Sequence, residues 1–310
     1  MQGGWIGGYP VGELIGWGGF ASVYRTHGPV GTPLVLKVAD QRGQGQRTFA
    51  LSVRPACAVA FQTGSHYVGA RLDLADVREM FRAEAIALRS AAGHRLPRLF
   101  DEQPAEGGSP VLVMEELTAP WALEQAPVED FARILDACAD LQRAGLAGHG
   151  DLKPEHVFVD ADGEFVFIDP GYQSDRFGTR APFRTLTPEY NPYPYVSAAA
   201  ADVCATAVMV YRRLTGGFPW LTEDWRATAL SHLSALSDGT MLPSHDACAL
   251  SAVAGWAKLV FGWLVAVLSA GGGLPAAQRA EPCRPRWLTD HLAAAAQLRE
   301  AIAGHTPELP

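Results

Sequence analysis

The sequence has few cysteines and more acidic residues than basic ones. Its five cysteines lie far apart, and no two have the spacing of a zinc-binding or redox pair, so we expect reduced thiols in a cytoplasmic protein. The formal net charge of -8 argues against a nucleic-acid partner, because a phosphate backbone is bound by a basic surface. What remains is a chain of 310 residues, 48% of them hydrophobic, which can bury one large core or two smaller ones.

Long apolar runs are also lacking. The segment Met1–Trp5 has neither the charged nor the apolar region of a signal peptide. The most apolar stretch, Leu259–Leu268, is about half as long as a helix that spans a bilayer, and Lys258 precedes it. We therefore expect a buried helix there and no membrane partner, with a membrane segment as the alternative.

The most informative segment is 149–156, HGDLKPEH, in which an aspartate stands two residues before a lysine that is followed by proline. Two apolar runs come next, separated by an Asp-Gly turn, and this pattern predicts a short β-hairpin. A hairpin returns the chain to its start, so His156 and Asp169 should be neighbours, with Asp151 close by. Three polar groups that converge on one end of an apolar ribbon are typical of a metal-assisted phosphoryl-transfer site.

Residues 9–39 alternate and turn like an antiparallel sheet, and segment 14–24, LIGWGGFASVY, lies within them. Its glycines allow a hairpin tip to lie close over a ligand, with backbone N–H groups facing phosphate oxygens. The alternative is an ordinary glycine-rich hairpin. Segment 34–39 is an apolar strand with a single lysine, Lys37, which either faces inward toward a partner or outward from an edge strand.

An amphipathic helix is predicted over 76–90, and Glu84 falls on its apolar stripe. The stripe consists of Val77, Met80, Phe81, Ala85 and Leu88. An unpaired carboxylate on a buried face destabilises a fold by several kcal/mol, so a cation should lie opposite Glu84. Lys37 is the candidate, and a partly exposed glutamate at the edge of the stripe is the alternative.

Further elements follow in order. Segment 111–117 is a buried strand that runs into acidic residues, and helices are predicted over 129–144, 198–215 and 288–301. Asp202 lies near the start of the helix predicted over 198–215, where a buried aspartate must accept hydrogen bonds; the alternative is an interaction with the helix dipole.

Taken in order, these motifs resemble the eukaryotic-like (bacterial Hanks-type) Ser/Thr protein kinases, closely over 9–220 and loosely over 220–303. The resemblance implies an α+β, two-lobed protein-kinase-like fold, with a small antiparallel β lobe that holds one long helix and a larger, mostly helical lobe. It implies one domain over 1–303, with the small lobe at 9–117, an insertion at about 40–72, the large lobe at 118–303 and a tail at 304–310.

The resemblance also implies ATP with Mg²⁺, or Mn²⁺ in its place, as cofactors. Asp151 would take the proton of the acceptor hydroxyl, Lys153 would neutralise the γ-phosphate, and Asp169 and His156 would bind metal. Lys37 would bind the α- and β-phosphates and pair with Glu84. The residues implied to bind ATP are Ile15, Gly16, Gly18, Val23, Val35, Lys37, Glu84, Met114, Glu115, Leu117 and Phe158.

Several positions depart from the family pattern. Ala21 replaces a glycine, His156 replaces the asparagine that binds the second metal, and Pro170 replaces the phenylalanine after the metal-binding aspartate. Gly150 stands where an arginine often reads a phosphorylated loop, so control through such an arginine is not expected. Near the end of the resemblance, Arg284 is expected to pair with Glu189.

Three functions remain open. The leading interpretation is a bacterial-type Ser/Thr protein kinase, because Asp151-Leu152-Lys153-Pro154 differs from the pattern of small-molecule phosphotransferases. A small-molecule or antibiotic phosphotransferase of the same fold is the second. The third is a pseudokinase scaffold that binds nucleotide or a partner without turnover, which His156 and Pro170 favour. The protein substrate and the role of 40–72 are not predicted.

Overall fold

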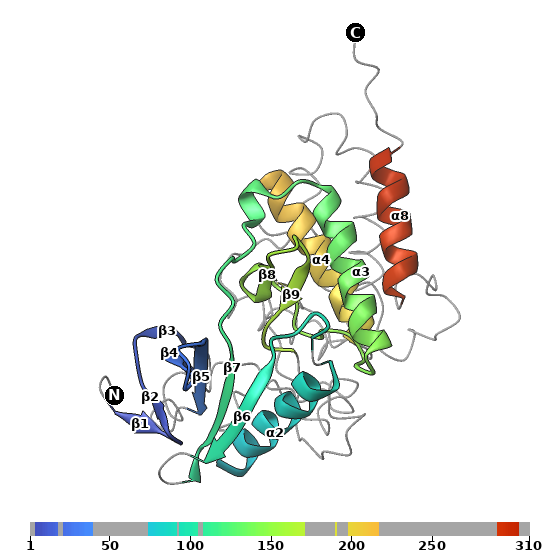
Figure 1. The fold of residues 1–310 in the computed structure, drawn as a ribbon. Helices are drawn as coiled ribbons and strands as arrows, with labels where there is room; N and C mark the ends of the chain where they lie inside the picture. The colour runs from blue at the N-terminus through green and yellow to red at the C-terminus, as the bar shows by residue number, and fades with distance from the viewer. Residues whose placement is uncertain are drawn as a thin grey trace, which may run out of the picture.

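A computed structural model describes residues 4–17, 21–39, 74–91, 93–104, 108–170, 190, 198–216 and 290–303. These residues form an α+β structure with one five-stranded antiparallel sheet and four α-helices (Figure 1). The insertion at 40–72, the apolar stretch 259–268, and Gly18, Glu189 and Arg284 lie outside the described residues. Among the residues that are described, no helix is long and apolar enough to cross a membrane.

The sheet carries the first half of the candidate site. Its strand order is β3-β4-β5-β7-β6, and every pairing is antiparallel. The strands are β3 (Leu14–Trp17), β4 (Ala21–His27), β5 (Pro33–Ala39), β6 (Leu99–Pro104) and β7 (Pro110–Glu115). A small hairpin of β1 (Trp5–Ile6) and β2 (Tyr9–Pro10) precedes the sheet. Because β5 lies in the middle, its side chains are buried on both faces after Pro33, so Lys37 cannot be an outward lysine on an edge strand.

Helix α2 (Leu74–Ser90) packs on β6 and β7. The stripe predicted from its sequence is buried, as Phe81, Ala85 and Leu88 are each at most 1% exposed. Alternation along the strands separates the two faces of the sheet: Val35, Leu112 and Met114 join the core that contains α2, while Leu36 and Val113 join a smaller cluster on the other face. The stripe of α2 therefore holds Glu84 toward the sheet.

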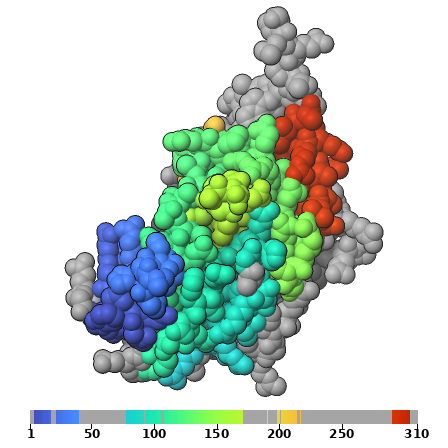
Figure 2. Space-filling model, viewed as in Figure 1, coloured from blue at the N-terminus to red at the C-terminus, as the bar shows by residue number. Residues whose placement is uncertain are grey.

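The helical part consists of α3 (Glu129–Arg143), α4 (Ala198–Thr215) and α8 (His291–Ala303), with a 3₁₀ turn, η3 (Leu123–Gln125), before α3. Helix α3 packs against both α4 and α8 (Figure 1), and Figure 2 shows α8 directly against the surface of α3. The core is continuous from Phe81 of α2 to Leu298 of α8. The last helix was predicted at 288–301, and it begins three residues later because Asp290 caps it with a bond to the N–H of Ala293.

The predicted hairpin forms between β8 (Val157–Val159) and β9 (Phe165–Phe167). Asp160 makes the turn, since its Oδ1 accepts the N–H groups of Asp162 and Glu164 at 2.9 and 2.8 Å. Gly163 has a φ of +79°, which a glycine adopts without strain. The hairpin thereby brings the segment after β9 back beside the short helix η4 (Pro154–His156) that precedes β8.

Candidate active site

Two carboxylates from distant parts of the chain meet the side chain of Lys37. Its Nζ donates to both carboxylate oxygens of Glu84 at 2.7 Å and to Oδ1 of Asp169 at 2.5 Å. Strand β5 supplies the lysine, α2 the glutamate, and the end of the β8–β9 hairpin the aspartate. Glu84 thus lies opposite the cation that the sequence assigned to it, and the lysine contacts the predicted metal ligand as well.

The charges explain why a lysine remains ionised while it is only 3% exposed. Burial lowers the pKa of Lys37, but the negative charges of Asp169 and Glu84 outweigh this effect and hold the pKa above its ordinary value. For Glu84 burial dominates and raises the pKa of the carboxyl. For Asp169 burial acts in the same direction, but the Lys37 charge prevails and the pKa lies well below its usual range. Asp169 is therefore an anion throughout the neutral range.

The carboxylate of Asp169 bonds to Lys37 and is also partly exposed to solvent. Its side chain is 43% exposed. Its φ is +51°, a left-handed conformation that aspartate adopts more readily than most residues. The N–H of Ile168 bonds to the carbonyl of His156 at 3.0 Å, which fixes the chain just before this turn. With Oδ1 on Lys37, Oδ2 faces His156.

His156 is buried and uncharged. Burial lowers the pKa of its imidazole well below the ordinary value, and the Lys153 charge acts in the same direction. Its Nδ1 lies 2.9 Å from the carbonyl oxygen of Asp151, and we assign the Nδ1–H as donor because a carbonyl only accepts. Nε2 then carries the lone pair, and it lies 3.6 Å from Oδ2 of Asp169.

These two atoms fit a divalent cation. Ligand atoms about 2.0–2.2 Å from one ion lie roughly 3–4 Å apart, so Nε2 and Oδ2 could bind the same ion. Neutral imidazole is a common metal ligand, whereas Mg²⁺ prefers oxygen. The donor set therefore favours Mn²⁺ over Mg²⁺ more than a carboxylate–amide pair would.

Asp151 and Lys153 lie beside this pair. Asp151 is 8% exposed, and its carbonyl oxygen holds His156. The positive charge of Lys153 lowers the pKa of both His156 and Asp169, so the three groups share one electrostatic environment. Proline at 154 begins the short helix η4, where a missing N–H leaves no bond unmade.

A buried carboxylate holds the loop that carries Asp151. Oδ2 of Asp202 accepts the N–H of His149 at 2.8 Å, and Oδ1 accepts the N–H of Gly150 at 2.7 Å. Asp202 is the fifth residue of α4, so its carboxylate bonds to the loop rather than serving the helix dipole. A Cβ on Gly148 would lie 2.5 Å from Oδ2, so only glycine lets the loop approach this closely.

Gly150 also has a backbone reason to be glycine. Its φ is +88°, a conformation that L side chains rarely adopt. Gly150 stands where the kinases that the sequence resembles often have an arginine that binds a phosphorylated loop. The left-handed backbone here would strain an arginine side chain, so the backbone also favours glycine.

Other residues that were implied to bind ATP come from neighbouring elements. Val35 and Met114 are register partners on β5 and β7, and both are 7% exposed. Gly16 pairs with Val23, which packs against the main core, and Ile15 is exposed. Phe158 of β8 forms an isolated bridge with Pro120.

Glu115 and Leu117 were both expected to bind ATP, and the backbone of Glu115 makes a hydrogen bond within the protein. The N–H of Glu115 bonds to the carbonyl of Arg98 at 3.0 Å, so this N–H is not the donor for a base. Leu117, two residues on, is half-buried and remains the candidate donor of this segment.

Sequence reasoning assigned no role to three residues that shape the site. Nε2 of His149 lies 2.9 Å from the carbonyl oxygen of Ile168, which directly precedes Asp169. Arg95 has a φ of +66° and pairs with Asp140 and Glu164, which ties the segment before β6 to α3 and the hairpin. His291 contacts Asp202. For none of them does local spacing in the sequence carry a signal.

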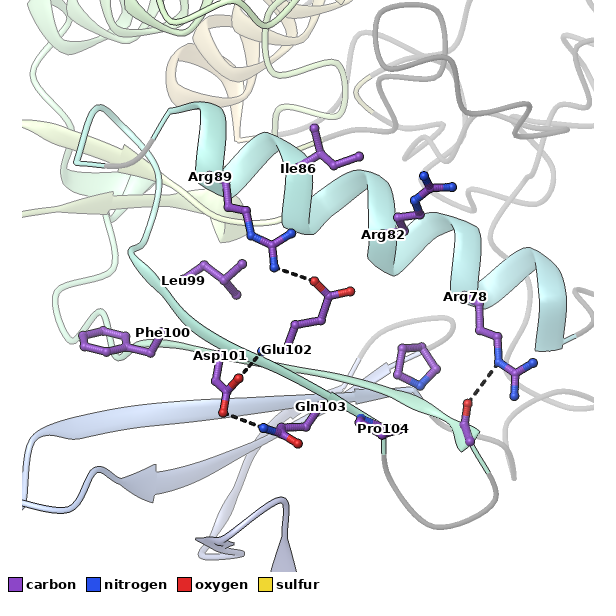
Figure 3. Close-up of a pocket in the computed structure, with 12 residues that line it drawn as sticks. Arg78, Arg82, Ile86, Arg89, Leu99, Phe100, Asp101, Glu102, Gln103 and Pro104 are labelled. Atoms are coloured by element: carbon purple, nitrogen blue, oxygen red, sulfur yellow. Dashed lines mark hydrogen bonds and ion pairs between the residues drawn. The ribbon is translucent and has the colours of Figure 1, made fainter.

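A groove of 840 Å³ lies elsewhere, between α2 and β6, and none of the predicted site residues lines it (Figure 3). Its arginines are engaged: Arg89 pairs with Glu102 at 2.6 Å and Arg78 donates to the carbonyl of Gly108 at 3.0 Å. The groove is therefore separate from the site around Lys37.

No family model matches the chain. Among curated proteins, it is 26% identical over 247 residues to the serine/threonine-protein kinase PknL of Mycobacterium tuberculosis, a match that covers 73% of this chain and 54% of that protein. It is 22% identical over 258 residues to the hormonally up-regulated neu tumor-associated kinase homolog A of Xenopus laevis, which covers 77% of this chain and 33% of that protein. The chain thus spans about half the length of the mycobacterial relative. This distant homology to Ser/Thr protein kinases supports a kinase-like phosphotransferase.

Proposed function

We propose that the chain is a two-lobed Ser/Thr protein kinase of the bacterial type, which transfers the γ-phosphoryl group of ATP to a protein hydroxyl. The observation that supports this most directly is Lys37 held between Glu84 and Asp169. A buried lysine that is fixed by one carboxylate and touches a second, more exposed one is suited to hold phosphates next to a metal.

Each residue then has a distinct task. Lys37, oriented by Glu84, binds the α- and β-phosphates. Asp169 Oδ2 and His156 Nε2 hold the divalent cation, which neutralises charge on the phosphates when it is bound. Asp151 orients the acceptor hydroxyl and takes its proton onto the carboxylate as the new O–P bond forms. Lys153 stabilises the negative charge of the transferring group.

His156 supports a second candidate, a pseudokinase that binds nucleotide without transfer. A nitrogen ligand in place of an oxygen ligand weakens Mg²⁺ binding, and a nucleotide held with one poorly bound metal turns over slowly. A small-molecule phosphotransferase remains the third candidate, and the acceptor distinguishes it.

The test is transfer of label from γ-labelled ATP by the full chain, with Mg²⁺ or Mn²⁺, to itself, to a Ser/Thr peptide mixture and to small hydroxyl compounds. Asp151→Asn should lower transfer to protein by about 10²–10⁴-fold, the usual effect of losing a general base, while nucleotide binding measured by thermal shift is retained. Arg82→Gln, a surface change on α2, serves as the control.

Each outcome selects one candidate. Transfer to peptide that depends on Asp151 supports the protein kinase. Binding of nucleotide without transfer in either metal refutes it in favour of the scaffold, and transfer to small compounds alone refutes it in favour of the third candidate.

A further inference from the structure

A histidine from the last described helix contacts the carboxylate that holds the catalytic loop. Nε2 of His291, the first residue of α8, lies 2.9 Å from Oδ2 of Asp202, and both side chains are 0% exposed. The same Oδ2 accepts the N–H of His149 at 2.8 Å. One oxygen atom therefore joins α8 to the loop before Asp151.

The position of His291 is set by contacts that do not involve Asp202. Asp290 caps the helix through the N–H of Ala293. Farther along, Leu298 packs into the main core, and Arg299 pairs with Asp136 of α3. Helix α8 is thus anchored on α3 and presents His291 to Asp202.

The buried imidazole of His291 contains one nitrogen that destabilises the fold. Among the described residues, Nδ1 of His291 is buried and has no hydrogen-bond partner. An unsatisfied buried acceptor destabilises a fold by about 1–3 kcal/mol, which an apolar side chain would avoid. The donor bond from Nε2–H to Asp202 is the interaction that accounts for a histidine here.

A metal site is the competing explanation, because Cys138 contributes a third ligand atom and the three lie within 4.8 Å of one another. Burial raises the pKa of the Cys138 thiol well above its ordinary value, and the Asp202 charge adds to this effect. Each oxygen of the carboxylate also already accepts a backbone N–H group, from His149 and from Gly150. These observations favour a hydrogen-bonded brace.

We infer that His291 is a positioning residue, which holds the Asp202 carboxylate in the orientation that accepts both loop amides and thereby sets the position of Asp151. The loop passes directly against the pair, since a Cβ on Gly148 would lie 3.0 Å from Cε1 of His291 as well as 2.5 Å from the carboxylate. The inference about catalysis rests on the proposed function, whereas the inference about the loop does not.

The experiment compares the full chain with His291→Leu, His291→Gln and Arg299→Gln. The glutamine amide reaches the position of Nε2 and keeps the donor, leucine removes it, and Arg299→Gln weakens the anchoring of α8 without touching Asp202. His291→Leu should lower kcat about tenfold, as expected for the loss of one hydrogen bond to a carboxylate, and leave the KM for ATP unchanged. His291→Gln should stay within about threefold of the wild type.

Amide hydrogen exchange of the segment 146–153 gives a readout that does not require activity. It should speed up in His291→Leu and remain unchanged in His291→Gln and Arg299→Gln. If the wild type transfers no phosphate while exchange follows this pattern, the brace is supported and the proposed function fails.

Three results would overturn the inference. The first is amide exchange of 146–153 in His291→Leu at the wild-type rate. The second is an equal loss of kcat in His291→Leu and His291→Gln. The third is stoichiometric zinc in the wild type that is lost in His291→Gln. If the leucine variant does not fold, His291→Asn, whose amide is too short to reach Asp202, is compared with His291→Gln by the same exchange measurement.

Discussion

Replacing Lys37 by methionine should destabilise the protein in a way that depends on pH. The change removes the cation that faces two carboxylates, and Glu84, whose side chain is only 9% exposed, is left without its partner. Breaking a buried ion pair by removing one member typically destabilises a fold by about 3–5 kcal/mol. Asp169 contributes little to this loss, because its side chain is 43% exposed and water can solvate it.

The pH dependence follows from the protonation of Glu84. Burial already raises its pKa in the wild type, where the Lys37 charge opposes the effect. Without the lysine, the folded-state pKa of Glu84 rises further above its unfolded-state value. A group with a raised folded-state pKa contributes stability at low pH and loses it as the pH rises through that value. The loss in Lys37→Met should therefore be larger at pH 8 than at pH 5.

The assay is denaturant unfolding of Lys37→Met, Glu84→Gln and the double variant at both pH values. The double variant should be more stable than Lys37→Met at pH 8 by about 2 kcal/mol, because glutamine carries no charge to be buried. Arg82→Met removes an exposed cation, paired with Glu79, from the same helix and should change stability by less than about 1 kcal/mol. Additive effects of the two single changes, or equal losses at pH 5 and pH 8, would refute the reasoning.

Two further predictions concern His156 and Gly148. His156→Asn replaces a nitrogen ligand by an oxygen ligand, so the ratio of Mg²⁺-supported to Mn²⁺-supported nucleotide affinity should rise. The lowered pKa of His156 also makes the wild type lose stability as the pH falls below about 6.5. The free energy of unfolding of the variant should therefore change less between pH 7 and pH 5. An unchanged metal ratio would remove His156 from the metal site. Gly148→Ala should lower the free energy of unfolding by more than about 2 kcal/mol, because its φ is +133° and its Cβ would meet Asp202, whereas Gly145→Ala, with a φ of +100° and no atom within 4 Å, should lose only about 1 kcal/mol. Equal losses in the two glycine variants would show that backbone strain, and not the contact with Asp202, decides the effect.

Local periodicity was enough to find the elements that carry the site. The stripe of α2 identified Glu84 as a carboxylate that needs a cation, and the Asp-Gly turn located the β8–β9 hairpin within one residue. Both inferences use neighbours three or four residues apart on a helix, or opposite each other in a hairpin, where spacing in the sequence is also spacing in space.

Contacts between distant elements could not be obtained in this way. His291 meets Asp202 from 89 positions further along the chain, and nothing in the sequence around either residue marks the other. The left-handed conformations of Arg95 and Asp169 were missed for a related reason, since each is imposed by partners on other elements and not by a local turn signal. The features that the sequence did not predict are thus the ones at which tertiary contacts override the local pattern.

The charges at the site argue that metal and nucleotide bind together. Lys37 bonds to Oδ1 of Asp169 and is shared with Glu84, and His156 is neutral, so Oδ2 of Asp169 presents carboxylate charge that no bond to Lys37 offsets. A polyphosphate that approached Lys37 alone would be repelled by this carboxylate. A divalent cation between Asp169 and the phosphates turns that repulsion into attraction. We therefore expect the affinity for ATP to fall steeply when the metal is removed by a chelator, and Asp169→Asn to abolish most of that metal dependence, as equilibrium binding of a fluorescent ATP analogue would measure.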